Sequence, residues 1–126
     1  MHINSISSVT YYIIDIEKTA KFYEALGFRM GKQEADSLIV YVNWFGITFR
    51  TADAVGVDEF KSEFDQSSKG AGHFLNMKVA NADKAYGEAV AVGVQPTSEP
   101  VDKPWGSREF TIIDPDGYKL VFFEKK

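Results

Sequence analysis

Apolar residues recur along the chain with two different periods, and the same succession of patterns occurs twice. Each half opens with a short run rich in β-branched and aromatic residues, at 9–14 and at 74–79, which predicts a strand. Each run precedes a stretch with apolar residues three or four positions apart, at 17–26 and at 82–92, which predicts an amphipathic helix. The pattern therefore predicts a strand, a helix and further strands in two successive copies.

Both predicted helices have signals at their ends. Asp15 and Asn81 stand at N-cap positions, and Gly27 and Gly93 follow the last helical turns. The two helices begin about half a chain length apart, although their residues differ. This repeat of architecture predicts two βαβββ modules, each with an apolar sheet face that must be covered.

The remaining segments complete the two modules. Five of them are predicted as strands: 37–42, 47–50, 94–97, 107–113 and 118–124. We expect a turn at 43–46, a loop at 98–106 and a tight hairpin turn at Asp114 to Gly117, where Pro and Gly set the backbone angles. The polar segment 54–70 is predicted as a connection with a short helical turn at Val57 to Phe64.

The length of 126 residues suits one domain with a sizeable core and is too short for two ordinary ones. We therefore predict a single domain over 1–126. Within it, module one covers about 5–53, a linker about 54–70, and module two about 71–126.

Composition and charge narrow the function classes. The net charge of −4 argues against nucleic-acid binding, which usually needs a basic face. The absence of cysteine removes disulfides and thiolate catalysis. With no apolar run of membrane-spanning length and no signal-peptide pattern, we expect a cytoplasmic protein that does not act at a membrane. The 18 aromatic residues either fill the core or line a pocket.

Two segments resemble one known superfamily. Lys21 to Phe28 (KFYEALGF) resembles the first-helix signature FYxxLGF of the vicinal oxygen chelate superfamily, and residues 104–124 resemble its closing hairpin. They are most similar to the glyoxalase/bleomycin resistance protein/dioxygenase-like family. The resemblance implies an α+β fold in which two βαβββ modules form a curved mixed sheet, with helices outside and a ligand cavity inside. It also implies a homodimer.

The resemblance also identifies the positions at which metal-dependent members hold their ion. These positions correspond here to Ser8, Phe74 and Val121, which supply neither a ring nitrogen nor a carboxylate. His73 is one residue away from the second position, and Glu124 is three residues past the third. A one-residue shift in a strand points the side chain to the other face, so we predict no metal site.

The same resemblance implies that alternate strand residues face the cavity. The expected ligand-binding residues are Thr10, Tyr12, Phe74, Asn76, Trp105, Glu109, Val121 and Phe123. In the strand at 107–113 the reverse face assignment stays open. Trp105, in a loop flanked by Pro, is either a lid over the core edge or a stacking platform for a planar ligand. Trp44 and Phe45, in a predicted turn, have the same two alternatives or belong to a dimer interface. Arg108 meets either an acidic neighbour or a ligand anion.

Three functions fit these residues. The first is a metal-free small-molecule-binding protein of the bleomycin-resistance-like branch. Its ligand would be a small aromatic or amphipathic molecule, and drugs and cations are among the candidates. A cation would gain from Glu109 and from the aromatic faces. The second is a metal-dependent lyase, isomerase or dioxygenase with an altered ligand set that includes His73, Glu109 or groups from a partner chain. The third is a structural module without a ligand. We favour the first, and the sequence identifies no catalytic residue.

Overall fold

Each half of the chain forms a four-stranded mixed sheet with one helix against it, which confirms the predicted α+β fold of two βαβββ modules. The computed structural model describes residues 1–52, 60, 62–63 and 69–126. The predicted helical turn at 57–64 falls mostly outside these residues. The chain divides into two compact units, Met1–Gln66 (unit 1) and Ser67–Lys126 (unit 2). That the two units form one domain stays a prediction.

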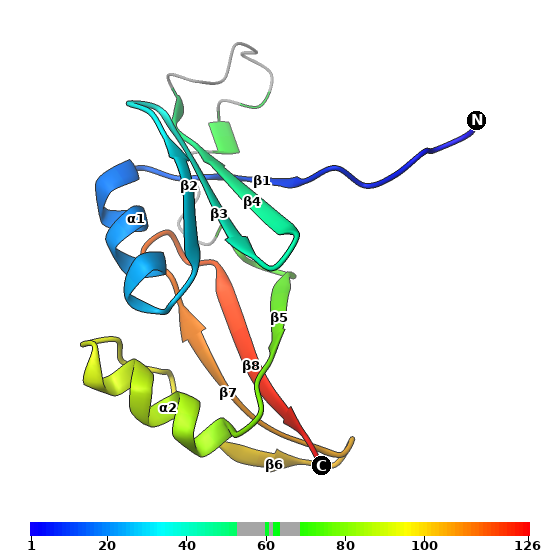
Figure 1. The fold of residues 1–126 in the computed structure, drawn as a ribbon, viewed down its shortest axis with the longest axis vertical. Helices are drawn as coiled ribbons and strands as arrows, with labels where there is room; N and C mark the ends of the chain where they lie inside the picture. The colour runs from blue at the N-terminus through cyan, green and yellow to red at the C-terminus, as the bar shows by residue number, and fades with distance from the viewer. Residues whose placement is uncertain (53–59, 61, 64–68) are drawn as a thin grey trace. The chain divides into compact units, whose positions relative to one another are not determined.

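Unit 1 contains the first helix and its sheet. Its elements are β1 (Val9–Tyr12), α1 (Ile16–Ala25), β2 (Arg29–Gln33), β3 (Ser37–Val42) and β4 (Phe45–Arg50). The strand order is β1-β4-β3-β2; β1 is parallel to β4 and the other pairs are antiparallel. Figure 1 shows α1 beside this sheet and the N-terminal residues extending away from β1.

The core of unit 1 lies between α1 and one face of its sheet. The N-cap prediction is confirmed, because Asp15 Oδ1 accepts the Lys18 backbone N–H at 3.0 Å. From α1 the Tyr23 ring enters the core, where its centroid is 4.8 Å from that of Phe49. Leu38 is fully buried beside them. Burial of each such side chain contributes roughly 1.5–3 kcal/mol, so this face is the stable side of the sheet.

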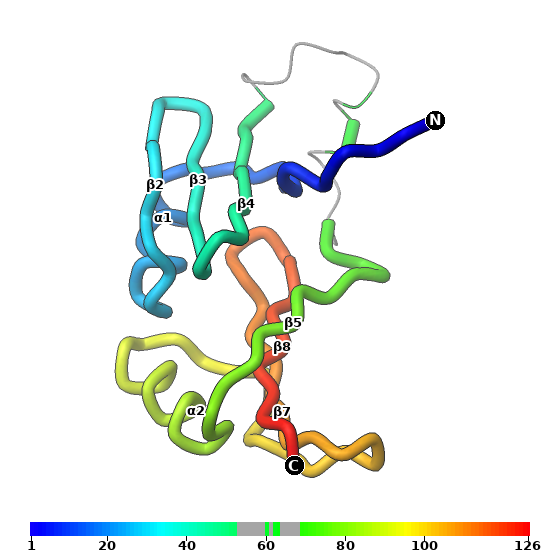
Figure 2. Tube along the Cα trace, turned by 45° about the vertical axis from the view of Figure 1, so that its right-hand side comes forward, coloured from blue at the N-terminus to red at the C-terminus, as the bar shows by residue number. Residues whose placement is uncertain are grey.

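Unit 2 repeats the plan with different residues. Its elements are β5 (Phe74–Lys78), α2 (Ala82–Ala91), β6 (Val101–Lys103), β7 (Ser107–Ile113) and β8 (Lys119–Lys125). The strand order is β5-β8-β7-β6, with β5 parallel to β8 and the other pairs antiparallel. Figure 2 shows β5, β7 and β8 together with α2 to one side.

Aromatic stacking organises the core of unit 2. The rings of Phe110 and Phe122 are nearly parallel, with centroids 5.2 Å apart, and Tyr86 from α2 meets Phe110 edge-on at 5.6 Å. Ile112 and Leu120 are fully buried on the same face. This face of β7 and β8 is therefore committed to packing against α2, and the opposite face carries the other half of their side chains.

Two strand predictions were wrong. The strand β2 was missed, since it carries few apolar residues and its pairing with β3 shifts register between Met30 and Gln33. The segment 94–97 is not a strand; Pro96 has no N–H to donate, and only Thr97 bonds to the carbonyl of Thr111. The edge strand lies instead at Val101–Lys103, inside the predicted loop 98–106.

A buried ion pair fixes the beginning of unit 2 to the turn between β7 and β8. Lys69 Nζ lies 3.1 Å from Asp116 Oδ1, and these side chains are only 7% and 4% exposed. Removal of either partner would leave a buried charge without its counter-ion, which costs about 3–5 kcal/mol. The next residue, Gly70, packs directly on this turn: a Cβ there would lie 2.8 Å from Tyr118 Cα and would overlap the Gly117 carbonyl oxygen.

This close approach predicts opposite effects for two glycine-to-alanine substitutions. Gly70→Ala should lower the free energy of unfolding by about 2–3 kcal/mol, because the backbone of the turn must move. Gly87→Ala, at an exposed site in α2 where nothing lies within 4 Å, should raise it by up to about 1 kcal/mol. Urea unfolding of both variants measures the difference. Equal effects would contradict the packing of Gly70 on the turn.

Candidate functional site

The sheet of unit 2 has one face that α2 does not cover. We call it the open face of unit 2: the alternate residues of β5 to β8 that share the side of Val121. The ladder between β5 and β8 places Asn76 opposite Val121, and the ladder between β7 and β8 places Thr111 opposite the same residue. Phe123 pairs with Glu109 one step along. Five of the predicted site residues therefore share this face, including Phe74 at the start of β5.

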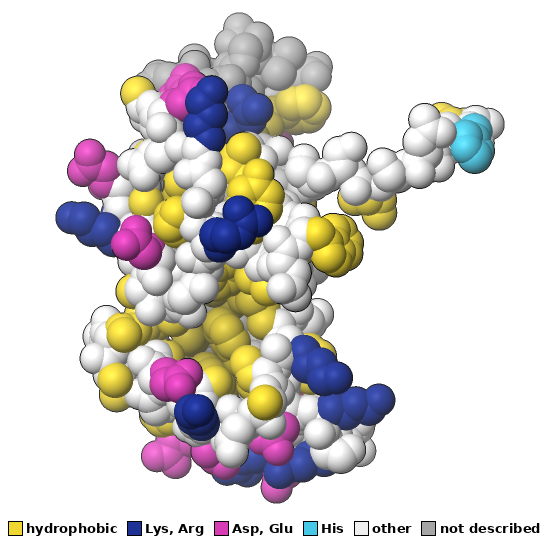
Figure 3. Space-filling model, in the orientation of Figure 1, with side chains coloured by type: hydrophobic (Ala, Val, Ile, Leu, Met, Phe, Trp, Pro, Cys, Tyr) yellow, Lys and Arg dark blue, Asp and Glu magenta, His cyan; other side chains and the backbone are white. Residues whose placement is uncertain are grey.

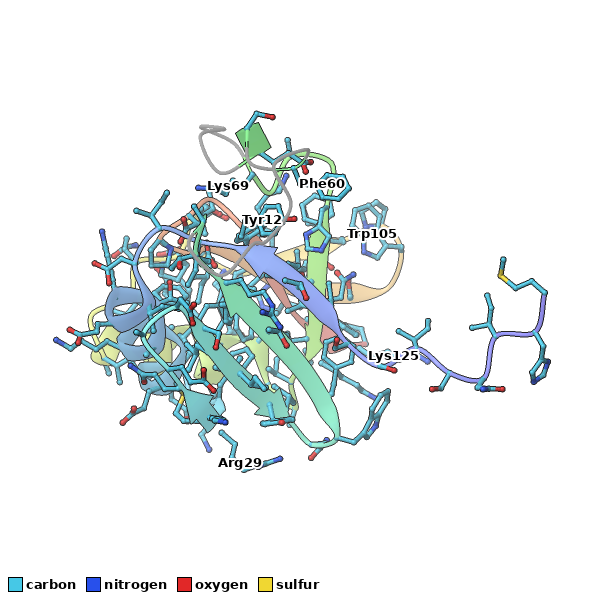
Figure 4. All side chains as sticks on the ribbon, turned by 90° about the horizontal axis from the view of Figure 1, so that it is seen from above. Tyr12, Arg29, Phe60, Lys69, Trp105 and Lys125 are labelled. Atoms are coloured by element: carbon cyan, nitrogen blue, oxygen red, sulfur yellow. The ribbon has the colours of Figure 1, made fainter. Side chains whose placement is uncertain are left out.

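Trp105 lies at the margin of this face, in the turn between β6 and β7. Its Nε1–H donates to Glu109 Oε2 at 3.3 Å, and the Ser107 hydroxyl donates to the same oxygen at 2.6 Å. Figure 4 shows the indole beside this turn, and the side chain is 69% exposed. An indole that is this exposed does not close the core edge. The two donors instead hold the Glu109 carboxylate and the indole in one arrangement.

Arg108 points to the opposite side, toward α2. Its guanidinium donates to both carboxylate oxygens of Asp83 at 3.0–3.3 Å and to Asp102 at 3.3 Å. These hydrogen bonds raise the pKa of Arg108, and the bond from Arg108 lowers the pKa of Asp83. In Figure 3 basic and acidic side chains lie together at this end of unit 2. Arg108 therefore meets acidic neighbours of its own chain.

Glu124 is also on the α2 side. Its Oε1 accepts the backbone N–H of Ala82, the first residue of α2, at 2.9 Å, and Lys126 Nζ lies 3.3 Å from Oε2. The Ala82 hydrogen bond, followed by Lys126, lowers the pKa of Glu124 below its ordinary value of 4.5. This carboxylate caps a helix, where an anion is favoured, and is not available to a metal.

Unit 1 has an open face of its own, on the side of its sheet away from α1. Thr10 pairs with Thr48 and Tyr12 with Arg50 across the β1–β4 ladder, so the two predicted site residues of this unit lie on that face. Beside them is a depression of about 380 Å³. Its lining residues are Lys32, Glu34, Asp36, Ser37, Ile39, Thr48 and Arg50.

Tyr41 lies across the strands of the same face. Cβ atoms on Gly31 and Gly46 would come within 2.7 and 3.0 Å of the two edges of its ring, so the ring needs a glycine at each position. The Arg29 guanidinium lies 4.5 Å above the ring centroid and donates to the Asn43 carbonyl at 3.4 Å. The ring is therefore flanked by two glycines at its edges, and Arg29 lies over one of its faces.

The sequence profile of the Glyoxalase/Bleomycin resistance protein/Dioxygenase superfamily matches residues 5–122. The chain belongs to this superfamily. Comparison with curated proteins gives no match. Neither helix of the described chain is long and apolar enough to cross a membrane.

Solved structures of the superfamily have the same fold. A glyoxalase/bleomycin resistance protein/dioxygenase from Nocardioides has a TM-score of 0.80 at 18% identity, over 99% of this chain and 86% of that one. A bleomycin resistance determinant encoded on transposon Tn5 has a TM-score of 0.66 at 22% identity, over 97% and 99%. A bleomycin-binding protein complexed with bleomycin has a TM-score of 0.65 at 22% identity, over 98% and 100%. At these identities the comparison establishes the fold.

The residues at the superfamily's metal positions do not fit an ion. Ser8 precedes β1, Phe74 begins β5, and Val121 lies within β8; a hydroxyl, a phenyl ring and an isopropyl group are poor ligands or none. His73 meets the Tyr118 ring edge-on, with centroids 6.5 Å apart. Among the described residues, no three His, Cys, Asp or Glu side chains form a group that could hold a metal ion.

Some residues of the two open faces were missed from the sequence. Ser107, which bonds to Glu109, and Thr48 and Arg50, which pair with the predicted residues of β1, were not identified. In β4 the alternation of apolar Ile47 and Phe49 with polar Thr48 and Arg50 is the signal that would have placed two of them; Ser107 has no such signal. Their partners depend on strand pairing between distant segments, which that alternation does not specify.

The contact between Glu124 and α2 predicts a pH-dependent stability. Because the folded state lowers the pKa of Glu124, its carboxylate stabilises the fold above about pH 4.5, and this contribution disappears as the pH falls through the lowered value. Glu124→Gln should therefore be less stable than the parent protein at about pH 7, and the gap should close at low pH. Urea unfolding over a pH series measures it. Glu88→Gln, on α2 but away from Ala82, is the control, and a gap independent of pH would contradict this cap.

Proposed function

We propose that this chain is a metal-free binding protein for small aromatic or amphipathic molecules, and that the open face of unit 2 contributes its binding surface. The observation that supports this most directly is the pair of hydrogen bonds from Trp105 and Ser107 to Glu109. They hold an exposed indole at the margin of a face that also carries Val121 and Phe123. Thr10 and Tyr12 on the open face of unit 1 are further members of the proposed set.

An aromatic side chain with a fixed orientation binds a ligand better than one that rotates freely. A ring that already has its bound orientation loses less conformational freedom when a ligand stacks on it. A stacked aromatic pair gains about 0.5–1.5 kcal/mol beyond the area that it buries. Phe74, 57% exposed at the other end of the face, does not fill a closed core and offers a second ring. These features favour a binding role over a purely structural one.

Membership of the superfamily also supports a role in small-molecule binding. Two structural relatives are a bleomycin resistance determinant and a bleomycin-binding protein with its ligand bound. Capture of a small molecule, drugs included, is therefore a function that this fold performs, and we propose it for this chain. The relatives' ligand is not carried over, since a likeness at 22% identity establishes the fold and not the ligand.

A metal-dependent lyase, isomerase or dioxygenase is less well supported by the donor set. Such an enzyme would need a ligand set built around His73 or Glu109, and the Glu109 carboxylate already accepts two hydrogen bonds. The proposal predicts no stoichiometric binding when Ni²⁺, Zn²⁺, Mn²⁺ or Fe²⁺ is titrated into chelator-stripped protein in a calorimeter. Tight binding of one ion per chain would make the metalloenzyme the better account.

A homodimer in the cytoplasm completes the proposal. Trp44, in the turn between β3 and β4, is 84% exposed, and an apolar side chain of this size at the surface often marks an interface. Light scattering should give about twice the chain mass of 14.1 kDa. A mass that stays at one chain at micromolar concentration would contradict the dimer.

The neutral compound 2-naphthamide is a suitable probe of the binding face. With about 13 non-hydrogen atoms, at about −0.3 kcal/mol per atom, it should bind with a Kd near 1 mM. Calorimetric titration in the presence of a chelator should show this binding in the parent protein and in Trp44→Ala, and a loss of about tenfold or more in Trp105→Ala.

Circular dichroism should show that both Trp variants keep the fold. Unchanged affinity in Trp105→Ala would remove Trp105 from the binding surface. Loss of binding in Trp44→Ala alone would move the surface to Trp44, either in unit 1 or at the dimer interface.

A further inference from the structure

Basic side chains gather on the open face of unit 2. Lys78 pairs with Phe123 across the β5–β8 ladder, and Lys119 pairs with Phe74. Lys103 and Lys125 both pair with Ser107, from the two strands beside it. Cross-strand partners share a face, so all four lysines lie on the side away from α2. In Figure 3 basic side chains lie beside β5 with no acidic side chain next to them.

The lysines on this face are not explained by an excess of basic residues in the protein. The whole chain has a net charge of −4, and residues 69–126 carry eight basic and eight acidic side chains. Of those eight acidic residues, Glu109 is on the open face. The others lie in turns and loops, on α2, or on the α2 side of the sheet, as Asp102 and Glu124 do. The fold therefore separates the charges of unit 2 by face.

The four lysines have no ion-pair partner among the described residues. Two of them lie over aromatic rings of the proposed binding surface. Lys119 Nζ is 4.7 Å from the centroid of Phe74, and Lys103 Nζ is 5.7 Å from a Trp105 ring. A carboxylate in contact with an ammonium group offers a full opposite charge and a charge-assisted hydrogen bond, neither of which a ring face offers. Lys103 and Lys119 are therefore able to leave these rings and pair with the anionic group of a ligand.

The single carboxylate on this face is engaged by its own chain. Glu109 Oε2 accepts from both Ser107 and Trp105, and these bonds orient the indole. We therefore treat Glu109 as a positioning residue for Trp105. Against this one carboxylate, the face carries four ammonium groups.

From this separation of charge we propose that the ligand of the open face is an aromatic or amphipathic anion, with a carboxylate, sulfonate or phosphate at the rim of its ring system. The inference rests on the proposed function and specifies its ligand class. A planar ligand that stacks on Phe74 or Trp105 displaces the ammonium group above that ring. An anionic rim gives the displaced Lys119 or Lys103 a partner, whereas a cationic rim is repelled.

The negative charge of the whole chain does not reverse this preference. At physiological salt the Debye length is about 8 Å, so distant carboxylates are screened while the lysines in contact with the ligand are not. The preference should therefore weaken when salt is raised, because each contact is at the surface.

Three probes that share one ring system test the proposal: 2-naphthoate, 2-naphthamide and (2-naphthyl)methylammonium. Calorimetry on the full chain at low salt should give an affinity for the carboxylate about tenfold or more above that for the ammonium compound, with the neutral amide between them. The difference should shrink in about 1 M salt. Equal affinities, or tighter binding of the ammonium compound, would overturn the inference while binding of the amide still supported the proposed function.

Lysine substitutions test whether the preference for the carboxylate over the ammonium compound arises on this face. The triple variant Lys78→Gln, Lys103→Gln and Lys119→Gln should lose most of the difference between carboxylate and ammonium and keep most of the affinity for the amide. Lys84→Gln, on α2, should behave as the parent does. Glu109→Gln, which keeps an acceptor for Trp105, should bind the carboxylate more tightly. A preference retained in the triple variant would overturn the inference, and failure of all three probes to bind the parent would overturn the proposed function as well.

Discussion

The hydrogen bonds of one buried carboxylate, that of Asp114, determine how unit 2 presents its side chains. Asp114 is 4% exposed, and its Oδ1 accepts the backbone N–H groups of Asp116 and Tyr118 at 2.9 Å. Gly117 completes the turn with a φ of 96°, which a residue with a side chain adopts only under strain. The turn sets the register of β7 against β8, and a slip of one residue would exchange the packed face for the open one. The positions of Glu109 and Phe123 on one face follow from that register.

The two faces of the unit 2 sheet then have separate tasks. The face toward α2 holds the stacked Phe110 and Phe122 rings, and its charges neutralise one another, as in the contacts of Arg108 with Asp83. The open face holds exposed rings and lysines without acidic partners in the described chain. Packing and paired charges provide stability on one side, so the other side can keep the unpaired charges and exposed aromatic rings that a binding surface needs.

Most of the fold could be predicted because its signals are local. Asp15 and Asn81 accept hydrogen bonds as N-caps, and β7 has the predicted bounds. The failures occur where local signals are weak: β2 is polar and irregular, and β6 is a three-residue edge strand that depends on its pairing with β7. The open face of unit 2 was harder to predict because it also depends on strand pairing. Alternation indicates which residues share a face, but the separation of charge between faces, and the anchoring of Trp105 by Glu109, depend on pairing between strands.

The proposed binding role requires that aromatic molecules bind to the open face of unit 2 without a metal. Amide chemical-shift mapping with 2-naphthoate, in the presence of a chelator, tests it directly. We expect the largest shifts at Asn76, Thr111, Phe123 and the Trp105 indole N–H, with small shifts in α2. Shifts centred elsewhere in the chain, or binding that the chelator abolishes, would contradict it.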